Sequence, residues 1–568
     1  MTTLREKQAV SSALWAAYGD ALGFPTELVN EVRLEQRIGR SSVSETVAWT
    51  RLVGGKFGAY VPLPAGAYSD DTQLRLCTSR AIRGDGHFDV EAFSKIELPV
   101  WLCYALGAGR GSKVGAAALA LRNTAWFGNF FEQKDTQYVN GGGNGAAMRV
   151  QPHVWAAANL SHADTYLVGV IRNTICTHGH PRAIAGAVIH AACLAYTMRE
   201  QAILQPDEWT SLGDFIEISL DLIFSDVDLN TFWIPSWEQQ TAKSLRGEML
   251  RAKDEWAAHV EECRQFLSQP PDAAYGQIVS KLGGMQPDQR GSGLKCALFA
   301  LVLAWTHRDS NPAIALRTSA NLLSSDTDTI SSMAGALVGA LFHESAPPVR
   351  VQDAGYVEYE ARRLTAVGEG RAAESFSYPD LLSWQAPRSQ LDAVGLVDGK
   401  VALAGVGWID PTSEEFSSGK SDVVWQWYET SFGQTVLCKR RSSLSSLAKS
   451  GYPAAASTME AYVRPAHLTE MRKDTRSRSR PESRDLFHDD GQVESSREEI
   501  RERAGAASSS GRSIDEMSDE AIQSGFPPRL IGEHILALSE RESGIELVVA
   551  YTAIIAKARR ARVKRGRQ

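Results

Sequence analysis

The sequence predicts an all-α fold for residues 1–345 and a different architecture for the rest of the chain. Apolar residues recur at helical spacing through this N-terminal part, starting with the stretch REKQAVSSALWAAYGDALG. Alanine and glycine are frequent in these runs, and small residues let helices approach one another closely. No alternation of strands with helices is apparent, so we do not expect a parallel sheet of the nucleotide-binding type. The expected result is a compact many-helix core.

Helices are expected wherever this apolar periodicity is uninterrupted. Beyond the first, the predicted ranges are 72–81, 92–107, 114–122, 162–175, 182–200, 213–224, 255–267, 293–306, 312–323 and 330–342. The longest apolar runs, AIAGAVIHAACLAY and CALFALVLAW, are shorter than the ~18 residues that a membrane span needs. Both are therefore predicted as buried core helices, and no contact with a membrane is expected.

The character of the chain changes after the stretch FHESAPPVRV. Residues 352–465 are predicted to form a small mixed or β-containing domain, because LVDGKVALAGVGWI places an Asp-Gly turn between apolar runs. Residues 470–513 are charged and rich in serine and arginine. They cannot offset their ordering entropy by burial, which predicts a disordered linker. Residues 514–568 are predicted to be helical and end in the basic tail KARRARVKRGRQ.

The composition limits the compartment and the partners. The 568 residues are 43% hydrophobic and 22% charged, as in soluble globular proteins, and the net charge of -7 argues against nucleic acid as the main partner. A contact with nucleic acid is expected, if anywhere, at the basic tail. The seven cysteines form no CxxC pair, which is typical of reduced thiols in a cytosolic protein. No secretory signal is visible, so we expect a cytoplasmic location.

Two predicted helix entrances each carry a pair of carboxylates. In SDDT, Asp70 and Asp71 follow a possible N-cap serine, and in SSDTDT the pair is Asp326 and Asp328. Each entrance alone could be a helix cap, because anions are favoured in a first helical turn. If folding brings the two together, four carboxylates would repel one another unless cations neutralise them. Oxygen ligands favour hard ions, so the residues point to two Mg²⁺ ions, with Mn²⁺ as the alternative.

Three further stretches could contribute to a site. The loop NGGGNGAAMRVQP can bring backbone amides close to a phosphate, although it lacks the P-loop pattern and could also be a plain turn. In THGHP, His178 could cap a helix, bind a metal or touch a sugar, and His180 is the weaker candidate. Glu27 closes the stretch YGDALGFPTE, follows a proline in a loop, and could reach into a cleft.

These stretches, in this order, resemble the ADP-ribosylglycohydrolase family over about residues 8–345. The motifs that carry the resemblance are GDALGFPTE, SDDT, GNGAAMR, TH and DTDTISSMAGALVGA. The resemblance implies an all-α fold built around two Mg²⁺ or Mn²⁺ ions. It also implies a hydrolase that removes ADP-ribose from a modified acceptor, expected to be a protein side chain. Activated water would attack ribose C1 of the N- or O-glycosidic bond.

The resemblance also implies roles for individual residues. Six would be metal ligands, with Asp328 as the bridging candidate: Ser69, Asp70, Asp71, Asp326, Asp328 and Thr329. The diphosphate or the nearby ribose would be held by Gly142, Gly143, Asn144 and Gly145, and the ribose by His178. The catalytic residues would be Glu27, Asp70 and Asp328, with Glu27 as the mobile acid that serves as general base or acid.

Two positions depart from the family pattern. Ser324 and Ser325 stand where relatives often have two glycines, and Lys113 stands where many carry an acid. The second departure leaves the detailed mechanism or the acceptor specificity open. Two other functions stay open as well. One is an ADP-ribose-binding module without turnover that recruits a partner through its C-terminal regions, and the other is a two-metal hydrolase acting on a phosphoester.

Overall fold

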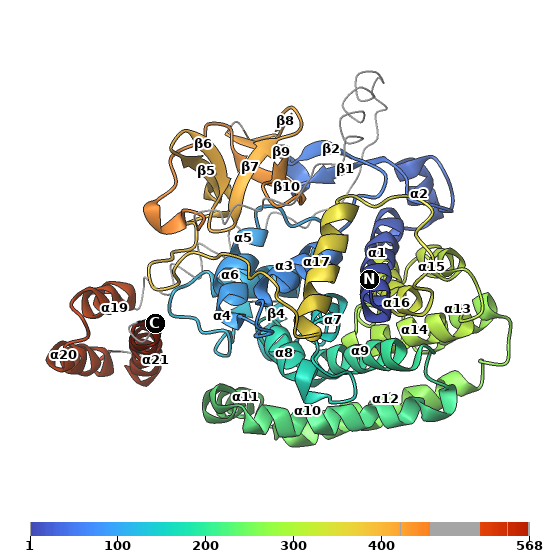
Figure 1. Cartoon of the computed structure of the whole chain (residues 1–568), viewed down its shortest axis with the longest axis horizontal. Coiled ribbons are helices and arrows are strands. Elements are labelled where there is room, and N and C mark those ends of the chain that lie inside the picture. Colours follow the sequence, from blue (N-terminus) through green and yellow to red (C-terminus); the bar gives the residue numbers. More distant parts are fainter. Residues whose placement is uncertain (1, 134, 421, 455–511, 542–543, 566–568) are drawn as a thin grey trace.

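The computed structural model describes residues 2–133, 135–420, 422–454, 512–541 and 544–565, which form a helical body, a sheet and a separate group of C-terminal helices (Figure 1). The helices of the body are α1 (Leu4–Gly23), α2 (Glu31–Ile38), α3 (Asp70–Ala81), α4 (Val90–Ala92), α5 (Leu98–Trp101), α6 (Arg110–Leu119), α7 (Gln151–Trp155), α8 (Asp164–Ile175), α9 (Pro181–Glu200), α10 (Asp214–Ser225), α11 (Ile234–Thr241), α12 (Leu245–Arg264), α13 (Pro271–Lys281), α14 (Gly293–Thr306), α15 (Pro312–Ala320), α16 (Thr327–Leu341) and α17 (Ala354–Gly368). The predicted all-α class of this body is confirmed. The predicted linker 470–513 lies outside the described residues, apart from its last two positions.

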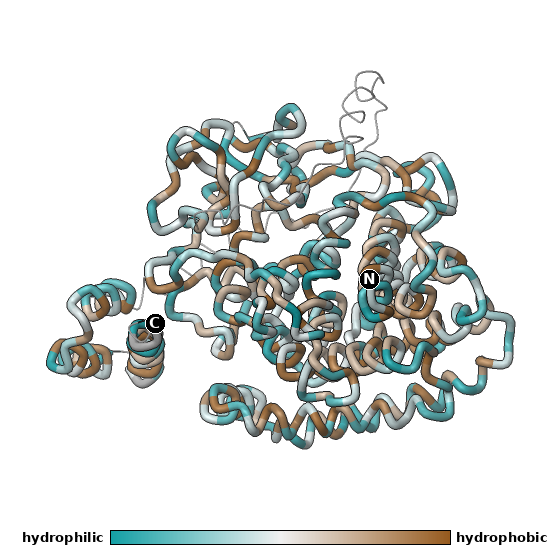
Figure 2. The backbone as a smooth tube through the Cα atoms, in the orientation of Figure 1, coloured by the Kyte–Doolittle hydropathy of each residue, from teal (hydrophilic) through white to brown (hydrophobic). Residues whose placement is uncertain are grey.

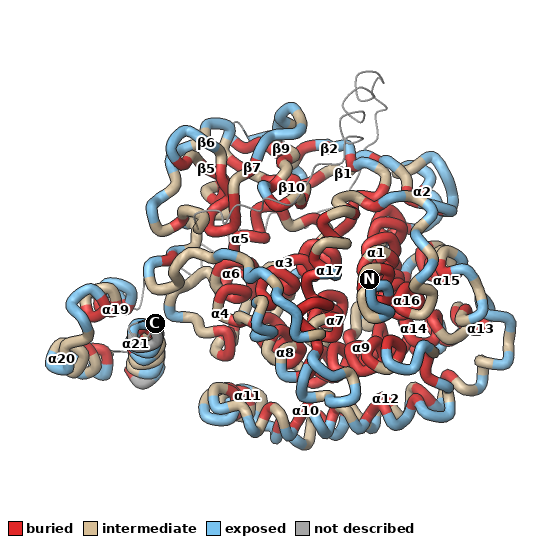
Figure 3. Tube along the Cα trace, in the orientation of Figure 1, coloured by how far each residue is buried: buried red, intermediate tan, exposed pale blue. Residues whose placement is uncertain are grey.

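The centre of the body is the pair α1 and α16, which pack along one another and are buried almost throughout (Figure 3). Their approach is so close that a Cβ atom built on Gly19 would lie 2.2 Å from the backbone oxygen of Ser331. The glycines of the two motifs GDALG and AGALVGA therefore allow this contact. At the outer edge, α12 alternates polar and apolar residues along its length, which is typical of a helix with one face in water (Figure 2).

Several predicted boundaries were wrong. The helix predicted over 92–107 ends at Trp101, because the chain then enters a turn and a loop in which Gly107 has a φ of 92°. It also includes a π-turn at Phe93–Glu97. The hairpin β1 (Trp49–Val53) and β2 (Ala59–Leu63) was not predicted, and neither was the short pair β3 (Glu132–Gln133) and β4 (Thr136–Gln137). Helix α17 packs against α1, so the helical body continues past residue 345.

The sheet that follows confirms the expected strands. It comprises β5 (Val394–Val397), β6 (Lys400–Leu403), β7 (Gly407–Pro411), β8 (Phe416–Ser417), β9 (Val423–Thr430) and β10 (Thr435–Arg441). The order is β10-β9-β7-β6-β5, every pair is antiparallel, and β8 pairs with β9. Trp425 and Leu437 of the sheet share a core with Phe24 and with the hairpin β1–β2. The sheet therefore packs against the segment that leads into Glu27.

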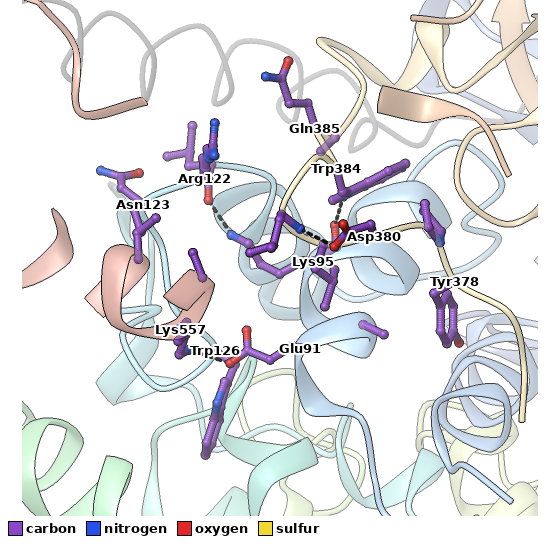
Figure 4. A pocket seen from close by; sticks show the side chains of 18 of the residues that line it. Glu91, Lys95, Arg122, Asn123, Trp126, Tyr378, Asp380, Trp384, Gln385 and Lys557 are labelled. Carbon is purple, nitrogen blue, oxygen red and sulfur yellow. Dashed lines mark hydrogen bonds and ion pairs between the residues drawn. The ribbon is translucent and has the colours of Figure 1, made fainter. Parts of the chain in front are cut away.

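The C-terminal helices α19 (Ile514–Gln523), α20 (Pro528–Ser539) and α21 (Gly544–Arg565) lie to one side of the body and have a core of their own (Figure 1). Ion pairs tie them to the body, one between Arg122 and Asp519 and one of 2.5 Å between Lys557 and Glu91 (Figure 4). These pairs line a cavity of about 1750 Å³ between the two parts. Within the described residues, none of the helices combines the length and the apolar composition that crossing a membrane requires.

Candidate active site

The N-terminus of α3 is capped by two residues, and neither belongs to the aspartate pair. The Ser69 hydroxyl accepts a hydrogen bond from the Asp71 backbone N–H (3.3 Å). Asp20 of α1 accepts bonds from the backbone N–H groups of Ser69 (2.8 Å) and Thr72 (2.9 Å), and from the Thr72 hydroxyl (2.6 Å). Because Ser69 and Asp20 satisfy the helix end, Asp70 and Asp71 are available for another purpose.

The N-terminus of α16 meets that of α3. The Thr329 hydroxyl donates to Asp71 Oδ2 across 3.3 Å, although the two residues are 258 positions apart in the sequence. Asp328 accepts a bond from the Thr329 backbone N–H (2.9 Å). The Asp71 Oδ1 atom is buried and has no hydrogen-bond partner. An unpaired buried carboxylate oxygen is costly, and it is suited to accept a ligand such as a metal ion.

A cavity of about 340 Å³ lies where these helix ends meet. Most of the predicted site residues line it: Glu27, Asp70, Asp71, Gly143, Asn144, Gly145, His178, Asp326, Asp328 and Thr329. Two predicted residues do not. Ser69 is fully buried beneath the α3 N-terminus, and Gly142 pairs with the opposite loop by accepting a hydrogen bond from the Gly293 backbone N–H (2.9 Å).

The carboxylates of this cavity destabilise one another. Burial, and then repulsion from neighbouring carboxylates, raises the pKa of Asp70, Asp71 and Asp328 well above the usual range. The nearby Lys113 ammonium acts in the opposite direction on the pKa of Asp70. Among the described residues, no three Asp, Glu, His or Cys side chains lie close enough to hold a metal ion by themselves. Hydroxyl groups or ligand oxygens would have to complete any such site, and an all-oxygen donor set fits a hard divalent cation.

Glu27 enters the cavity from the turn that follows α1. It directly follows the one-turn helix Phe24–Thr26, and Arg37 donates a hydrogen bond to its backbone oxygen (3.4 Å). The next residue, Leu28, has a φ of 55°, a left-handed conformation that is unusual for a bulky side chain. Burial raises the pKa of Glu27 to about 7, against the opposing effect of the nearby Arg51 guanidinium. At neutral pH this carboxyl group can both accept and donate a proton.

The glycine loop forms the opposite wall. A Cβ atom on Gly145 would lie 2.5 Å from Ser112 Oγ, so a larger residue there would have to displace the Ser112 side chain. The Asn144 backbone N–H donates to the Gly291 oxygen (2.9 Å), and its side chain donates to Asp326 Oδ2 (3.0 Å). The loop leads into the single turn Ala147–Arg149, so a long-helix dipole contributes little, and an anion would have to be held by backbone amides of the loop.

The two histidines of THGHP have different positions and contacts. His178 is buried, and its Nε2 atom faces the glycine loop, since a Cβ built on Gly145 would lie 3.2 Å from it. His180 instead caps α9, because its Nδ1 atom accepts a hydrogen bond from the Arg182 backbone N–H (3.1 Å). The lower expectation for His180 agrees with this position.

Sequence reasoning missed two parts of the site. The capping role of Asp20 could have been suspected, because Asp20 stands inside the quoted motif GDALG. The loop that ends at Gly293 gave only a turn signal, GGMQPDQRGSG, yet it pairs with the glycine loop through a bridge between Gly143 and Ser292. Its Arg290 guanidinium also acts on the pKa of Glu27.

Comparisons with known proteins identify the family of the chain. The family model described as ADP-ribosylglycohydrolase matches residues 1–372. The ADP-ribosyl-[dinitrogen reductase] glycohydrolase of Rhodospirillum rubrum is 28% identical over 189 residues, which are 33% of this chain and 54% of that protein. The chain thus matches about half the length of this relative. A solved chain titled "ADP-ribosylglycohydrolase-related protein complex" covers 64% of this chain and 99% of its own length, with 20% identity and a TM-score of 0.38. Because the family model spans more than half of the residues, the chain belongs to the ADP-ribosylglycohydrolase family.

Proposed function

We propose that this chain hydrolyses the glycosidic bond between ADP-ribose and a modified acceptor, with a protein side chain as the acceptor. One observation carries the proposal beyond family membership. The hydrogen bond between Thr329 and Asp71 joins the two carboxylate-bearing helix ends in a cavity that Glu27, the glycine loop and His178 also line. Each of these parts would have its own role in the release of ADP-ribose: holding the metal ions, binding the substrate or transferring a proton.

Two divalent cations, Mg²⁺ or alternatively Mn²⁺, are proposed for the junction of α3 and α16. Their ligands would be Asp70 and Asp71 from one helix end, and Asp326, Asp328 and Thr329 from the other. Ser69, which does not line the cavity, would support Asp71 through the hydrogen bond from its hydroxyl to Asp71 Oδ2 (3.4 Å). The orphaned Asp71 Oδ1 atom and the raised carboxylate pKa values support this assignment. Bound there, such ions would offset the carboxylate charge and act as Lewis acids towards the ribose hydroxyls and water.

The chain's own groups would bind and orient the substrate. The backbone amides of Gly143 and Gly145 would hold the diphosphate, since the Asn144 amide already donates to Gly291, and His178 would contact the ribose. This fixes the anomeric carbon relative to the carboxylates. Positive charge would develop at that carbon as the glycosidic bond breaks, and Asp70 and Asp328 would stabilise it electrostatically.

Glu27 is the proposed proton carrier. Its pKa of about 7 lets it take a proton from the attacking water or give one to the leaving acceptor. Lys113, in the position where relatives often have an acid, acts on the pKa of Asp70 and cannot serve as a carboxylic acid. Proton transfer in this chain is therefore assigned to Glu27 and not to the position of Lys113.

A release assay tests the proposal. The full chain is mixed with a panel of ADP-ribosylated arginine, serine and other acceptors, with Mg²⁺ or with chelator, and free ADP-ribose is measured. The expected result is release from at least one acceptor, which chelator abolishes and Mg²⁺ restores. Absence of release from every acceptor contradicts the enzyme assignment. If ADP-ribose then still raises the melting temperature, the chain is a binding module.

A further inference from the structure

Arg149, the last residue of the motif GNGAAMR, is fully buried, and the proposed chemistry gives it no role. Its guanidinium is held by hydrogen bonds on two sides. Nε donates to Asn173 Oδ1 (2.7 Å), while Nη2 donates to the Asn173 backbone oxygen (3.0 Å) and to the Thr177 hydroxyl (2.9 Å). Burying a charge this deeply costs free energy, which raises the question of what role the Arg149 charge has in the site.

The direction of each hydrogen bond in this network can be deduced. The Thr78 hydroxyl of α3 donates to the Leu74 backbone oxygen (3.0 Å). It can then accept the bond from Asn173 Nδ2 (2.9 Å), and this fixes the orientation of the Asn173 amide. With Nδ2 on Thr78, the amide oxygen faces Arg149, which can only donate. All partners therefore agree on one arrangement.

The hydrogen bonds of Thr177 also determine the protonation of the neighbouring His178 ring. The Thr177 oxygen accepts a bond from Arg149 and lies 2.8 Å from His178 Nδ1. Thr177 is buried, so its single hydroxyl hydrogen needs an acceptor, and the Nδ1 lone pair is within reach. When Nδ1 accepts, the ring proton of a neutral histidine must be on Nε2. Burial and the positive charge of Arg149 lower the pKa of His178 to about 3, which keeps the ring neutral.

The Nε2 atom that carries this proton faces the cavity. Cβ atoms built on Gly111, Gly143 and Gly145 would lie 3.7, 3.8 and 3.2 Å from it, so glycine backbone surrounds the donor. A bound molecule can therefore approach the N–H without meeting a side chain from these positions.

We propose that Arg149 and Thr177 are positioning residues that hold His178 as a neutral Nε2–H donor, aimed at an acceptor oxygen of bound ADP-ribose. The identity of the ligand rests on the proposed function, whereas the tautomer is a property of the chain alone. In this state Nδ1 is occupied and Nε2 is protonated. His178 therefore orients the substrate and does not act as a general base.

The tautomer can be read directly by NMR of the full chain labelled with ¹⁵N-histidine at pH 7. The His178→Gln variant identifies the signals of His178. The expected spectrum shows a protonated Nε2 and an unprotonated Nδ1 in the wild type, without any substrate. A wild-type ring that is protonated at Nδ1, or at both nitrogens, overturns the proposal. Because the spectrum is measured on the wild type, the result does not depend on whether a Thr177 variant folds.

Variants of Thr177 test the cause. Thr177→Val removes the hydroxyl donor and is expected to shift His178 towards a mixture of tautomers, while Thr177→Ser restores the wild-type spectrum. The matched control is Thr174→Val, because the Thr174 hydroxyl is equally buried and bonds only to the Val170 oxygen of its own helix (2.8 Å). An unchanged tautomer in Thr177→Val contradicts the proposal.

Binding of free ADP-ribose gives the functional readout. Loss of one oriented donor is expected to raise the dissociation constant of Thr177→Val about tenfold, with Thr174→Val within about twofold of the wild type. Equal dissociation constants for Thr177→Val and the wild type overturn the role in binding. If the wild type shows the expected tautomer but does not bind ADP-ribose, the positioning of His178 by Arg149 and Thr177 stands and the proposed function fails.

Discussion

Asn144 Nδ2 donates a hydrogen bond to Asp326 Oδ2 across 3.0 Å, and this contact joins the glycine loop to the N-terminus of α16. Thr329, in the first turn of the same helix, contacts Asp71 of α3. The proposed diphosphate loop and the two proposed halves of the metal site are thus linked by direct contacts. Their positions depend on one another, so a substitution in one is expected to affect the others.

Replacing Glu27 with Gln tests the proton carrier. The amide keeps the size of the side chain but cannot exchange a proton at neutral pH. We expect the rate of ADP-ribose release to fall by about 100- to 10,000-fold, while the dissociation constant for ADP-ribose changes little. Single-turnover release and equilibrium binding measure the two quantities. Glu35→Gln is the control, because Glu35 is an exposed residue on the following helix α2. Equal release rates for the wild type and Glu27→Gln would remove Glu27 from the mechanism.

Replacing Ser324 with Gly tests the strain beside Asp326. Ser324 is exposed and has a φ of 73°, a region that glycine enters without steric conflict. We expect Ser324→Gly to stabilise the fold by about 0.5 kcal/mol, since relief of strain exceeds the added chain entropy. Thermal or denaturant unfolding measures this change. Ser324→Ala keeps the unfavourable φ, so a similar gain there would show that strain is not the reason.

Replacing Glu97 with Gln tests the support behind α3. Arg80 of α3 and Glu97 form a fully buried ion pair, and Arg80 also bonds to Gln434 (2.7 Å) in the turn between β9 and β10. Removing the negative partner leaves a buried cation, which is expected to cost about 3–5 kcal/mol in denaturant unfolding. Glu344→Gln disrupts an exposed pair with Lys7, where water screens the charges, and should change stability far less. Similar effects of the two variants would contradict this account.

Replacing Asp353 with Asn tests a pH dependence. Asp353 accepts hydrogen bonds from Tyr68 (2.6 Å) and from the backbone N–H of Thr435 (2.7 Å), and burial raises its pKa to about 6. The folded state therefore holds this proton more tightly than the unfolded state. Its stabilising contribution is complete below pH 4 and is lost as the pH rises through about 6.

Asparagine can keep these hydrogen bonds without titrating. Relative to Asp353→Asn, the wild type should lose up to about 2 kcal/mol of unfolding free energy between pH 4 and pH 8. Denaturant unfolding at both pH values checks the difference. A constant difference across this range would show that Asp353 does not titrate with a raised pKa.

The order and type of most helices could be predicted, because a buried helix must repeat apolar residues at its own period. The segment 92–107 shows the limit of that signal. From Leu98 to Leu106 every residue is apolar, so periodicity cannot reveal that the chain turns after Trp101 towards Gly107. The hairpin β1–β2 was missed because its strands are five residues long and one contains Pro62.

The site could be predicted only where a motif stands close together in the sequence. The carboxylate pairs were visible as excess charge at two helix entrances. Contacts between distant segments were not visible, such as Asp20 capping α3 from 49 residues away or the loop before Gly293 pairing with Gly142. The tautomer of His178 depends on Thr78, Asn173 and Arg149 together, and no local pattern encodes it.

The central claim is that the N-termini of α3 and α16 jointly hold two divalent cations. Titration of the metal-free full chain with Mn²⁺, followed by calorimetry or electron paramagnetic resonance, tests it most directly. The account predicts saturable binding of two ions, and Asp71→Asn and Asp328→Asn should each weaken it at least about tenfold. Glu35→Gln should bind as the wild type does. No saturable binding, or unchanged binding in both aspartate variants, would contradict the claim.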